Sequence, residues 1–339
     1  MKKSDAVQLI FQPLLQQRGD SVWQPQREQG LAFAPTNIAL CKYWGKRDEQ
    51  LNLPMTSSLS VAIPEKGSMT HLTLHDQPDD IVVLNGDELA ADTQFVQRIK
   101  AYLDLFRLEQ SWRLRIDIQL NIPVAAGVAS SACGFASLIS ALNDMFAWQL
   151  SMRDLSILAR LGSGSAARSL WAGFVEWHAG VQADGMDSYA EPLKFEWSEL
   201  NLGILLVTEK EKSISSREAM QHTVDSSLLY ANWPRKVARD MVIFRQALQA
   251  KNFSLLGGTA ESNALTMHAT MLSSWPPICY FLPETIAAMH QVWQLRKEGL
   301  ELYFTQDAGP NLKLLFVEKN KEKVLGAFPK LEVSKLFVE

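Results

Sequence analysis

Two runs of small residues in this sequence have the composition of anion-binding turns. The first, PVAAGVASSA, covers residues 123–132, between a strand-like and a helix-like segment. Small side chains let the backbone approach a bulky anion, and hydroxyls at a helix start lie beside unsatisfied N–H groups. The run favours a triphosphate with Mg²⁺, although it lacks the Gly-Lys-Ser/Thr ending of a Walker A loop. A turn that packs helix against sheet, with Ser130 as its N-cap, explains the same residues equally well.

The second run, GSGSAARS at residues 162–169, has the same character and lies between two helical segments. It places two hydroxyls and the guanidinium of Arg168 within a few residues. Arginine suits a carboxylate or a phosphate because its planar fork can donate two parallel hydrogen bonds. An ordinary Gly/Ser turn between helices accounts for this run without any ligand.

Two further segments carry charged residues in unusual surroundings. In APTNIALCKYWGKR, residues 34–47, Lys42 and Lys46 stand four apart among large aromatic residues. A lysine in apolar surroundings is usually paired with an anion, here a substrate phosphate or a carboxylate elsewhere in the fold. The segment DAGPN at residues 307–311 lies between two strand-like segments. Its residue types are those of a tight turn, and by itself it indicates no more than that.

Composition limits what these residues can belong to. The chain has 339 residues, of which 47% are hydrophobic, and a net charge of −4, values typical of a globular protein of two domains. The charge balance argues against nucleic-acid binding, and no run approaches the roughly 20 apolar residues of a membrane span. The cysteines, Cys41, Cys133 and Cys279, are odd in number and far apart. We therefore expect a reducing, cytoplasmic environment and no membrane association.

The periodicity of the chain predicts the elements that must position these residues. Strands are expected at 59–63, 69–74, 81–84, 113–120, 202–207, 300–305 and 312–317. Helices are expected from 131 to about 146 and at 155–161, 217–230, 233–250 and 283–298, with another in the first 33 residues, where Val7, Ile10, Phe11 and Leu14 share a face. Because strands and helices do not alternate regularly, the pattern favours two α+β domains that meet near residue 198.

Five segments, taken in order, resemble the diphosphomevalonate decarboxylase family of the GHMP kinase superfamily. They are NIALCKYWGKRDEQLNLPMTSSLS, IPVAAGVASSACGF, LGSGSAARSLWAGFVEW, SNALTMHATMLSSWPP and DAGPN. The resemblance implies a two-domain GHMP kinase fold: an extension over 1–33, a ribosomal-S5-like ATP-binding domain over 34–198 and a ferredoxin-like domain over 199–339. It also implies a homodimer that uses ATP and Mg²⁺ to convert (R)-5-diphosphomevalonate into isopentenyl diphosphate, CO₂, ADP and phosphate, in the mevalonate pathway.

The same resemblance assigns roles to individual positions. The catalytic residues would be Asp307, which orients or deprotonates the substrate hydroxyl, Lys42, which stabilises the transferring phosphoryl group, and Arg168, which grips the C1 carboxylate. The substrate's phosphates would be bound by Tyr43, Lys46, Ser163, Ser165 and Ser216. The ATP loop would contain Pro123, Gly127, Ser130 and Ser131, with Ser131 also at the Mg²⁺ ion.

Some positions depart from the family pattern. Thr56 and Ala219 replace the more usual Asn and Gly, and no arginine occurs between Gly67 and Gln97, where Lys66 or Arg98 could substitute. These departures leave mono- and diphosphate substrates both open. A kinase of mevalonate or phosphomevalonate and a catalytically silent binding module are the alternatives, and the intact set of charged catalytic residues argues against both.

Overall fold

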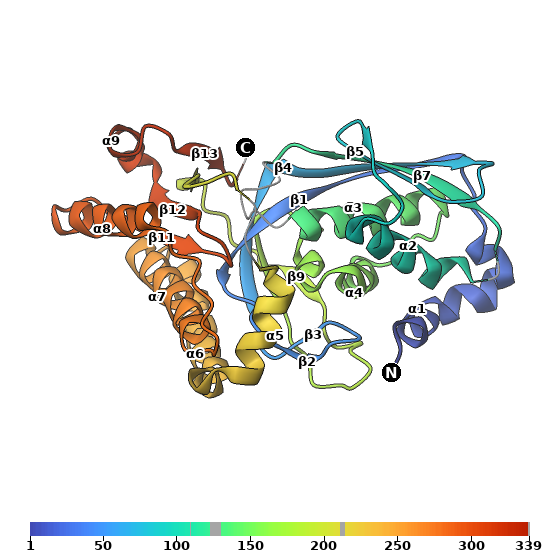
Figure 1. The fold of residues 1–339 in the computed structure, drawn as a ribbon, viewed down its shortest axis with the longest axis horizontal. Helices are drawn as coiled ribbons and strands as arrows, with labels where there is room; N and C mark the ends of the chain where they lie inside the picture. Colours follow the sequence, from blue (N-terminus) through green and yellow to red (C-terminus); the bar gives the residue numbers. More distant parts are fainter. Residues whose placement is uncertain (109, 123–129, 211–213, 338–339) are drawn as a thin grey trace.

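The computed structural model describes residues 1–108, 110–122, 130–210 and 214–337 of the chain. Two sheets lie side by side, each with helices packed on it (Figure 1). The larger is built from the first two hundred residues and the smaller from the rest. The predicted α+β class is therefore confirmed. Within these residues no helix combines the length and the apolar character that a membrane span requires.

The larger sheet has the order β6-β5-β7-β4-β8-β9, with β1 also paired to β4. Its strands are β1 (Gln29–Cys41), β4 (Ser58–His75), β5 (Ile81–Leu84), β6 (Asp87–Glu88), β7 (Arg113–Leu120), β8 (Phe174–Trp177) and β9 (Ala190–Pro192). A separate small hairpin joins β2 (Lys46–Asp48) to β3 (Leu53–Pro54). In β7 the predicted alternation holds, because Leu114, Ile116 and Ile118 are buried while their neighbours are partly exposed.

The strands predicted at 59–63 and 69–74 are one continuous strand, β4, so that division was wrong. The residues between them include Pro64 and Gly67, which read as a strand end in the sequence. In the structure the pairing with β1 shifts register between Pro35 and Thr36 and then continues. The irregularity is a bulge inside a long ladder, which bends the strand without ending it.

Helices cover one face of this sheet (Figure 1). They are α2 (Gln94–Arg107), α3 (Ser130–Met145), α4 (Met152–Gly162) and the short 3₁₀ turn η2 (Gly164–Arg168). Helix α3 packs on β1 and β4 with Phe135, Leu138 and Leu142 buried, as its apolar stripe predicts. The helix start and the η2 turn, which carry the two small-residue runs, are thereby brought into contact with each other.

The first residues pack into this same domain. Helix α1 (Lys3–Arg18) was expected, and a 3₁₀ turn, η1 (Gly19–Trp23), follows it. Its Val7 and Phe11 are fully buried in the apolar cluster that also contains the sheet residues. Strand β1 begins at Gln29, inside the predicted extension. The division of the chain at residues 33 and 198 stays a prediction.

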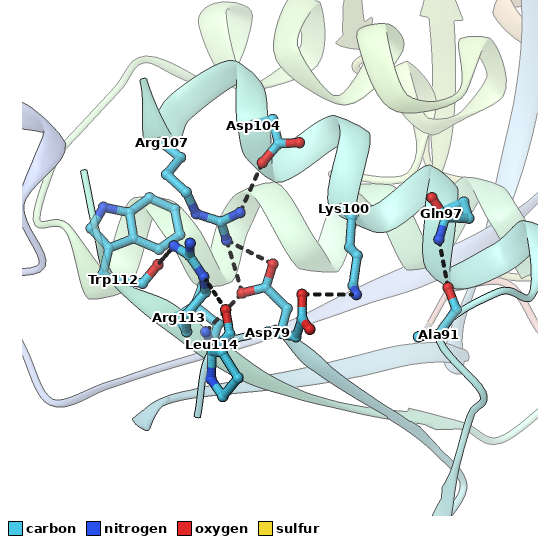
Figure 2. A network of polar contacts seen from close by, with 11 residues as sticks. Asp79, Ala91, Gln97, Lys100, Asp104, Arg107, Trp112, Arg113 and Leu114 are labelled. Atoms are coloured by element: carbon cyan, nitrogen blue, oxygen red, sulfur yellow. Dashed lines mark hydrogen bonds and ion pairs between the residues drawn. The ribbon is translucent and has the colours of Figure 1, made fainter. Parts of the chain in front are cut away.

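The network around Arg107 fixes α2 to the larger sheet (Figure 2). Arg107 Nη2 donates to both oxygens of Asp80, at 2.8 and 2.7 Å, and Nη1 donates to Asp104 at 2.8 Å. The guanidinium lies 4.6 Å from the ring centroid of Trp112, and Asp80 also accepts the backbone N–H of Leu114. Both terminal nitrogens of Arg107 thus have carboxylate partners within the fold.

The smaller sheet is antiparallel, with the order β11-β12-β10-β13. Its strands are β10 (Leu200–Leu205), β11 (Leu302–Gln306), β12 (Leu312–Val317) and β13 (Glu332–Lys335). The helices of this part are α5 (Ser216–Ser226), η3 (Leu228–Asn232), α6 (Trp233–Gln249), α7 (Phe253–Leu272), α8 (Pro283–Lys297), η4 (Glu318–Asn320) and α9 (Lys321–Ala327). Helix α7 escaped sequence prediction because it is buried on most sides and shows no amphipathic stripe.

Candidate active site

One carboxylate lies between two buried lysines where the two sheets approach each other. Asp307 follows β11, Lys42 follows β1, and Lys313 lies within β12. Lys42 Nζ is 2.7 Å from Asp307 Oδ1, and Lys313 Nζ is 3.1 Å from Oδ2. Burial alone would raise the pKa of Asp307, but the ammonium groups of Lys313 and Lys42 outweigh it and hold that pKa well below its usual range. Asp307 is therefore ionised at neutral pH.

Lys42 is held in place from several directions. Its Nζ also donates to the carbonyl oxygen of Ala39 at 2.7 Å, and its backbone N–H donates to Asn263 Oδ1 at 2.8 Å. The amide of Asn263, on α7, donates in turn to Asp240 Oδ2 at 2.7 Å, and Asp240 pairs with Lys236 on α6. The C-terminal helices thus fix the backbone of a lysine that the N-terminal sheet supplies.

His268 fixes the turn that carries Asp307. Its Nε2 lies 3.1 Å from the Asp307 carbonyl oxygen, which can only accept, and its ring stacks on Phe281. Burial and the Lys42 charge lower the pKa of His268 to about 3. The imidazole is therefore neutral, with its proton on Nε2, and it orients the Asp307 backbone without adding charge.

Arg168 lies in η2, near the same carboxylate. Its Nη1 donates to Ser58 Oγ at 2.5 Å and its Nη2 to Asn37 Oδ1 at 3.3 Å, while its guanidinium lies over the ring of Trp177. Burial lowers the pKa of Arg168 to about 10, and the charge of Asp307 opposes that shift. The side chain therefore stays cationic at neutral pH.

Buried polar atoms without a protein partner gather beside this guanidinium. Among the described residues, Arg168 Nε and the Tyr43 hydroxyl are buried and make no hydrogen bond. The Tyr43 ring stands edge-on to Trp177, and a Cβ on Gly164 would lie 2.7 Å from the Tyr43 hydroxyl oxygen. Unpaired buried donors cost free energy, so their presence here points to a polar ligand.

The predicted serines lie on the turns expected of them. Ser131 Oγ, on the first turn of α3, is 3.3 Å from Ser163 Oγ, so the two small-residue runs meet. Ser165 lies in η2 and Ser216 is the first residue of α5. Pro123, Gly127 and the side chain of Ser130 lie outside the described residues.

Lys46, from β2, belongs to a positively charged part of the site. Burial and the charge of Arg217 lower the pKa of Lys46 to about 8, and the same two causes lower the pKa of Arg98. Figure 1 shows α5, which carries Arg217, beside the hairpin of β2 and β3. Of the two proposed substitutes for a missing arginine, Arg98 is near these charges, whereas Lys66 forms an ion pair with Glu332 of the smaller sheet.

Sequence reasoning missed several of these contributors. Lys313 gave a signal, since it is the one charged residue of the apolar strand LKLLFV, and a buried lysine requires an anion. Asn263 and His268 lie in the segment SNALTMHATMLSSWPP, but no local sequence pattern predicts their contacts with Lys42 and Asp307. Arg217 stands next to Ser216 and was not singled out. No group of three or more potential His, Cys, Asp or Glu metal ligands occurs within the described ranges.

Comparison with known proteins decides the family. A family model for the diphosphomevalonate decarboxylase-like N-terminal domain matches residues 34–190. A model for the mevalonate 5-diphosphate decarboxylase C-terminal domain matches residues 202–335. The chain belongs to the diphosphomevalonate decarboxylase family. The resemblance drawn from the five sequence segments is confirmed.

Individual relatives agree with this assignment. The chain is 39% identical to the diphosphomevalonate decarboxylase of Aspergillus fumigatus over 86% of its own length and 78% of that protein, and 35% identical to that of Saccharomyces cerevisiae, over 88% and 80%. The crystal structure of mevalonate diphosphate decarboxylase from Staphylococcus aureus has a TM-score of 0.86 at 37% identity, covering 92% of this chain and 96% of that one. A structure of MDDEF in complex with MVAPP, AMPPCP and magnesium has a TM-score of 0.83 at 39% identity, covering 91% and 96%. The two-domain GHMP-type fold is thereby confirmed.

Proposed function

We propose that this protein is the ATP-dependent decarboxylase that converts (R)-5-diphosphomevalonate into isopentenyl diphosphate in the mevalonate pathway. The observation that carries the proposal is the ionised carboxylate of Asp307, fixed between two lysines and close to Arg168, in a chain of this family. The other products are CO₂, ADP and phosphate.

Asp307 orients the tertiary 3-hydroxyl of the substrate. The carboxylate accepts the hydroxyl hydrogen bond and aligns the oxygen with the γ-phosphorus of ATP. Because the lysines hold the pKa of Asp307 so low, it is a weak base, and the hydroxyl proton passes to its carboxylate only as the new O–P bond forms and the bond from the γ-phosphorus to ADP breaks. Phosphoryl transfer through a loose transition state needs positioning more than a strong base. The arrangement therefore supports orientation rather than prior deprotonation.

Lys42 and Lys313 place two positive charges where the transferring phosphoryl group becomes more anionic. Both side chains are about 2% exposed, so water screens them little. The C3–O bond then breaks with its electron pair leaving on phosphate, the C1–C2 bond breaks, and its pair becomes the C2–C3 double bond. Charge on the departing phosphate is stabilised by the same lysines.

Arg168 binds the C1 carboxylate that is lost as CO₂. The planar guanidinium is held by Ser58 and Asn37 through its terminal nitrogens, and Nε has no partner among the described residues. The Tyr43 hydroxyl, also without a partner, provides a further donor for the substrate. This supports the assigned roles of both residues.

The phosphates of the substrate bind at the Ser163 and Ser165 hydroxyls, at Lys46, and at the start of α5 with Ser216 and Arg217. Burial, and then the charge of Arg217, lower the pKa values of Lys46 and Arg98, and an anionic ligand relieves the repulsion between these cations. This charge excess suits a diphosphate better than a monophosphate. It supports the main proposal over the phosphomevalonate alternative.

ATP and Mg²⁺ are the cofactors, and the residues present fit them. The start of α3 offers backbone N–H groups and the Ser131 hydroxyl to the ATP phosphates, together with the loop of Pro123, Gly127 and Ser130. Both oxygens of Asp307 are ion-paired with lysines, so this carboxylate is not free to bind Mg²⁺. The ion would instead be held by the Ser131 hydroxyl, phosphate oxygens and water, which are ligands that Mg²⁺ accepts. When bound, the ion neutralises charge on the transferring phosphates.

The direct test supplies ATP, Mg²⁺ and each of three substrates, mevalonate, its 5-phosphate and its 5-diphosphate, and measures ADP and CO₂ together. We expect ADP and CO₂ in equal amounts with the diphosphate. ADP without CO₂ would make the protein a kinase, and neither product with any substrate would make it a silent binding module.

A cytoplasmic location and a homodimer complete the proposal. Cys41 and Cys279 carry free thiols, as expected of a reducing compartment. Sedimentation equilibrium of the purified protein measures the assembly state, and a mass of one chain at micromolar concentration would contradict the homodimer.

A further inference from the structure

Lys3, near the start of the chain, reaches the second small-residue run. It is the first residue of α1, and its Nζ donates to the carbonyl oxygen of Leu161 at 2.6 Å. Leu161 stands two residues before Ser163, and its carbonyl oxygen also accepts from Asn52. An ammonium group has three N–H donors, so two remain for a ligand. The family model begins at residue 34, well after this lysine.

Arg98, on α2, lies over a ring that packs against this run. Its guanidinium lies 5.2 Å from the ring centroid of Phe135, on α3. A Cβ added to Gly162 would lie 2.2 Å from that ring, so Phe135 packs directly on the turn. Figure 1 shows α1, α2 and α4 on the same side of the larger sheet. Lys3 therefore contacts the backbone just before Gly162, and Arg98 approaches from a second helix, close enough for its charge to act on Lys3.

These two residues join Lys46 and Arg217 in a cluster of four cations from four elements, which we call the cation cluster. None of the four forms an ion pair with any described carboxylate within 4 Å. Burial, and then the charges of Arg217 and Arg98, lower the pKa of Lys3 to about 8, and Lys3 in turn acts on Lys46. The carboxylate of Glu49 opposes the repulsion at Lys46, but it forms no ion pair with this lysine. Like charges held together with too few anions cost free energy, which an anionic ligand would recover.

We propose that Lys3 is a specificity-determining residue, whose ammonium binds the diphosphate of the substrate together with Arg98. The proposal rests on the proposed function of this site. It makes α1 part of the active site, because a residue from outside the family-matched region completes the cation cluster beside Ser163.

The test replaces Lys3 with methionine, which keeps the length of the side chain and removes its charge. We expect the KM for the 5-diphosphate substrate to rise about tenfold or more, because one charge-assisted contact is lost. The KM for ATP should stay unchanged, and the preference for diphosphate over monophosphate should fall by a similar factor. Lys3→Arg should retain most of the affinity. If Lys3→Met does not fold, Lys3→Gln serves in its place.

Two controls separate this role from simple packing of α1. Lys2→Met removes a neighbouring exposed charge and should leave every constant unchanged. Val7→Ala loosens the buried face of α1 without changing charge. If Val7→Ala raised the substrate KM as much as Lys3→Met does, or if Lys3→Met left it unchanged, the proposal would be wrong.

A binding readout keeps the inference distinct from the decarboxylase proposal. Calorimetric titration with inorganic diphosphate, in the absence of ATP, should show about tenfold weaker binding to Lys3→Met than to the wild-type protein. Absence of CO₂ release by the wild type would overturn the proposed function alone. Equal binding of diphosphate by the two proteins would overturn the role of Lys3.

Discussion

Two clusters of acidic and basic side chains in this protein differ in their ratio of positive to negative charge. Around Arg107 on α2, one cation faces two carboxylates, those of Asp80 and Asp104, and both oxygens of Asp80 are bonded (Figure 2). Around Asp307, one carboxylate faces two lysines, with the cationic Arg168 nearby. In the first cluster every charged group has a partner of opposite charge within the fold. The second has a surplus of positive charge.

The two clusters also differ in their buried side-chain atoms that make no hydrogen bond. Among the described residues of the α2 network, the Arg107 Nε is a buried side-chain atom without a partner, and that guanidinium lies over the ring of Trp112. Near Asp307, the Tyr43 hydroxyl and the Arg168 Nε are both buried without partners among the described residues. A network in which every charged group has a partner of opposite charge stabilises the fold, whereas an excess of positive charge beside unmet donors favours an anionic ligand.

The largest expected effect comes from the Asp307→Asn variant. We expect kcat to fall by about 10²–10⁴-fold. The neutral amide accepts a weaker hydrogen bond from the substrate hydroxyl than the carboxylate does, and it cannot take the proton. The Kd for ATP, measured by equilibrium titration, should stay nearly unchanged, since other residues hold the nucleotide. A variant that keeps more than about a tenth of the wild-type kcat would show that Asp307 is not catalytic.

The Asp80→Asn variant tests the other side of the comparison. It leaves Arg107 without its buried partner, and we expect the free energy of unfolding to fall by about 3–5 kcal/mol. Urea unfolding measures this loss, and kcat of the folded protein should not change. Asp104→Asn is the matched control, because its side chain is 63% exposed and should cost less than about 1 kcal/mol. A large loss of kcat in Asp80→Asn would contradict a purely structural role.

Arg168→Lys asks whether the geometry or only the charge of the guanidinium matters. We expect KM for the substrate to rise about tenfold to a hundredfold, with a lower kcat, because lysine cannot make the two-pronged contact with a carboxylate. Arg107→Lys is the control and should leave KM unchanged. Normal kinetics in Arg168→Lys would mean that the C1 carboxylate is not held by a fork.

A smaller effect is expected from pH. Lys46 has a pKa of about 8 in the free protein, through burial and the charges of Arg217, Lys3 and Arg98, which the carboxylate of Glu49 opposes. The lowered pKa means that Lys46 is charged at pH 7 and largely neutral at pH 9. We therefore expect kcat/KM for the diphosphate substrate to fall about tenfold over this range.

Lys46→Arg supplies the control for the pH profile. A guanidinium stays charged throughout this range, so the fall in kcat/KM should become shallower. An identical profile in the variant and the wild type would assign the titration to another group.

The fold was predictable at β7 and α3, where the burial pattern has one clear period, although α2, which is equally amphipathic, was not predicted. Strand β7 alternates in sequence and in burial, and α3 buries the stripe that its spacing predicts. Prediction failed at α7, which is apolar on most sides and contains Gly257 packed against Tyr303. It also failed at the bulge in β4, since a proline and a glycine read as a strand end when the pairing with β1 is unknown.

The site was predictable mainly through resemblance to a family. Lys42 and Asp307 are 265 residues apart in the chain, and no local pattern places them at 2.7 Å. The sequence shows Lys313 only as a residue of a strand, because its contact with Asp307 depends on how β12 lies beside the Asp307 turn. Lys3 was unpredictable for a further reason, because its segment has no counterpart in the recognised motifs and its contact is made across 158 residues.

The central claim is that the cation cluster of Lys3, Lys46, Arg98 and Arg217 binds the diphosphate of the substrate. Its most direct test compares kcat/KM for the 5-diphosphate, the 5-monophosphate and free mevalonate at one ionic strength. Two charge-assisted hydrogen bonds of about 1.5–3 kcal/mol each predict a preference for the diphosphate of roughly a hundredfold or more. Equal or better use of the monophosphate would contradict the claim.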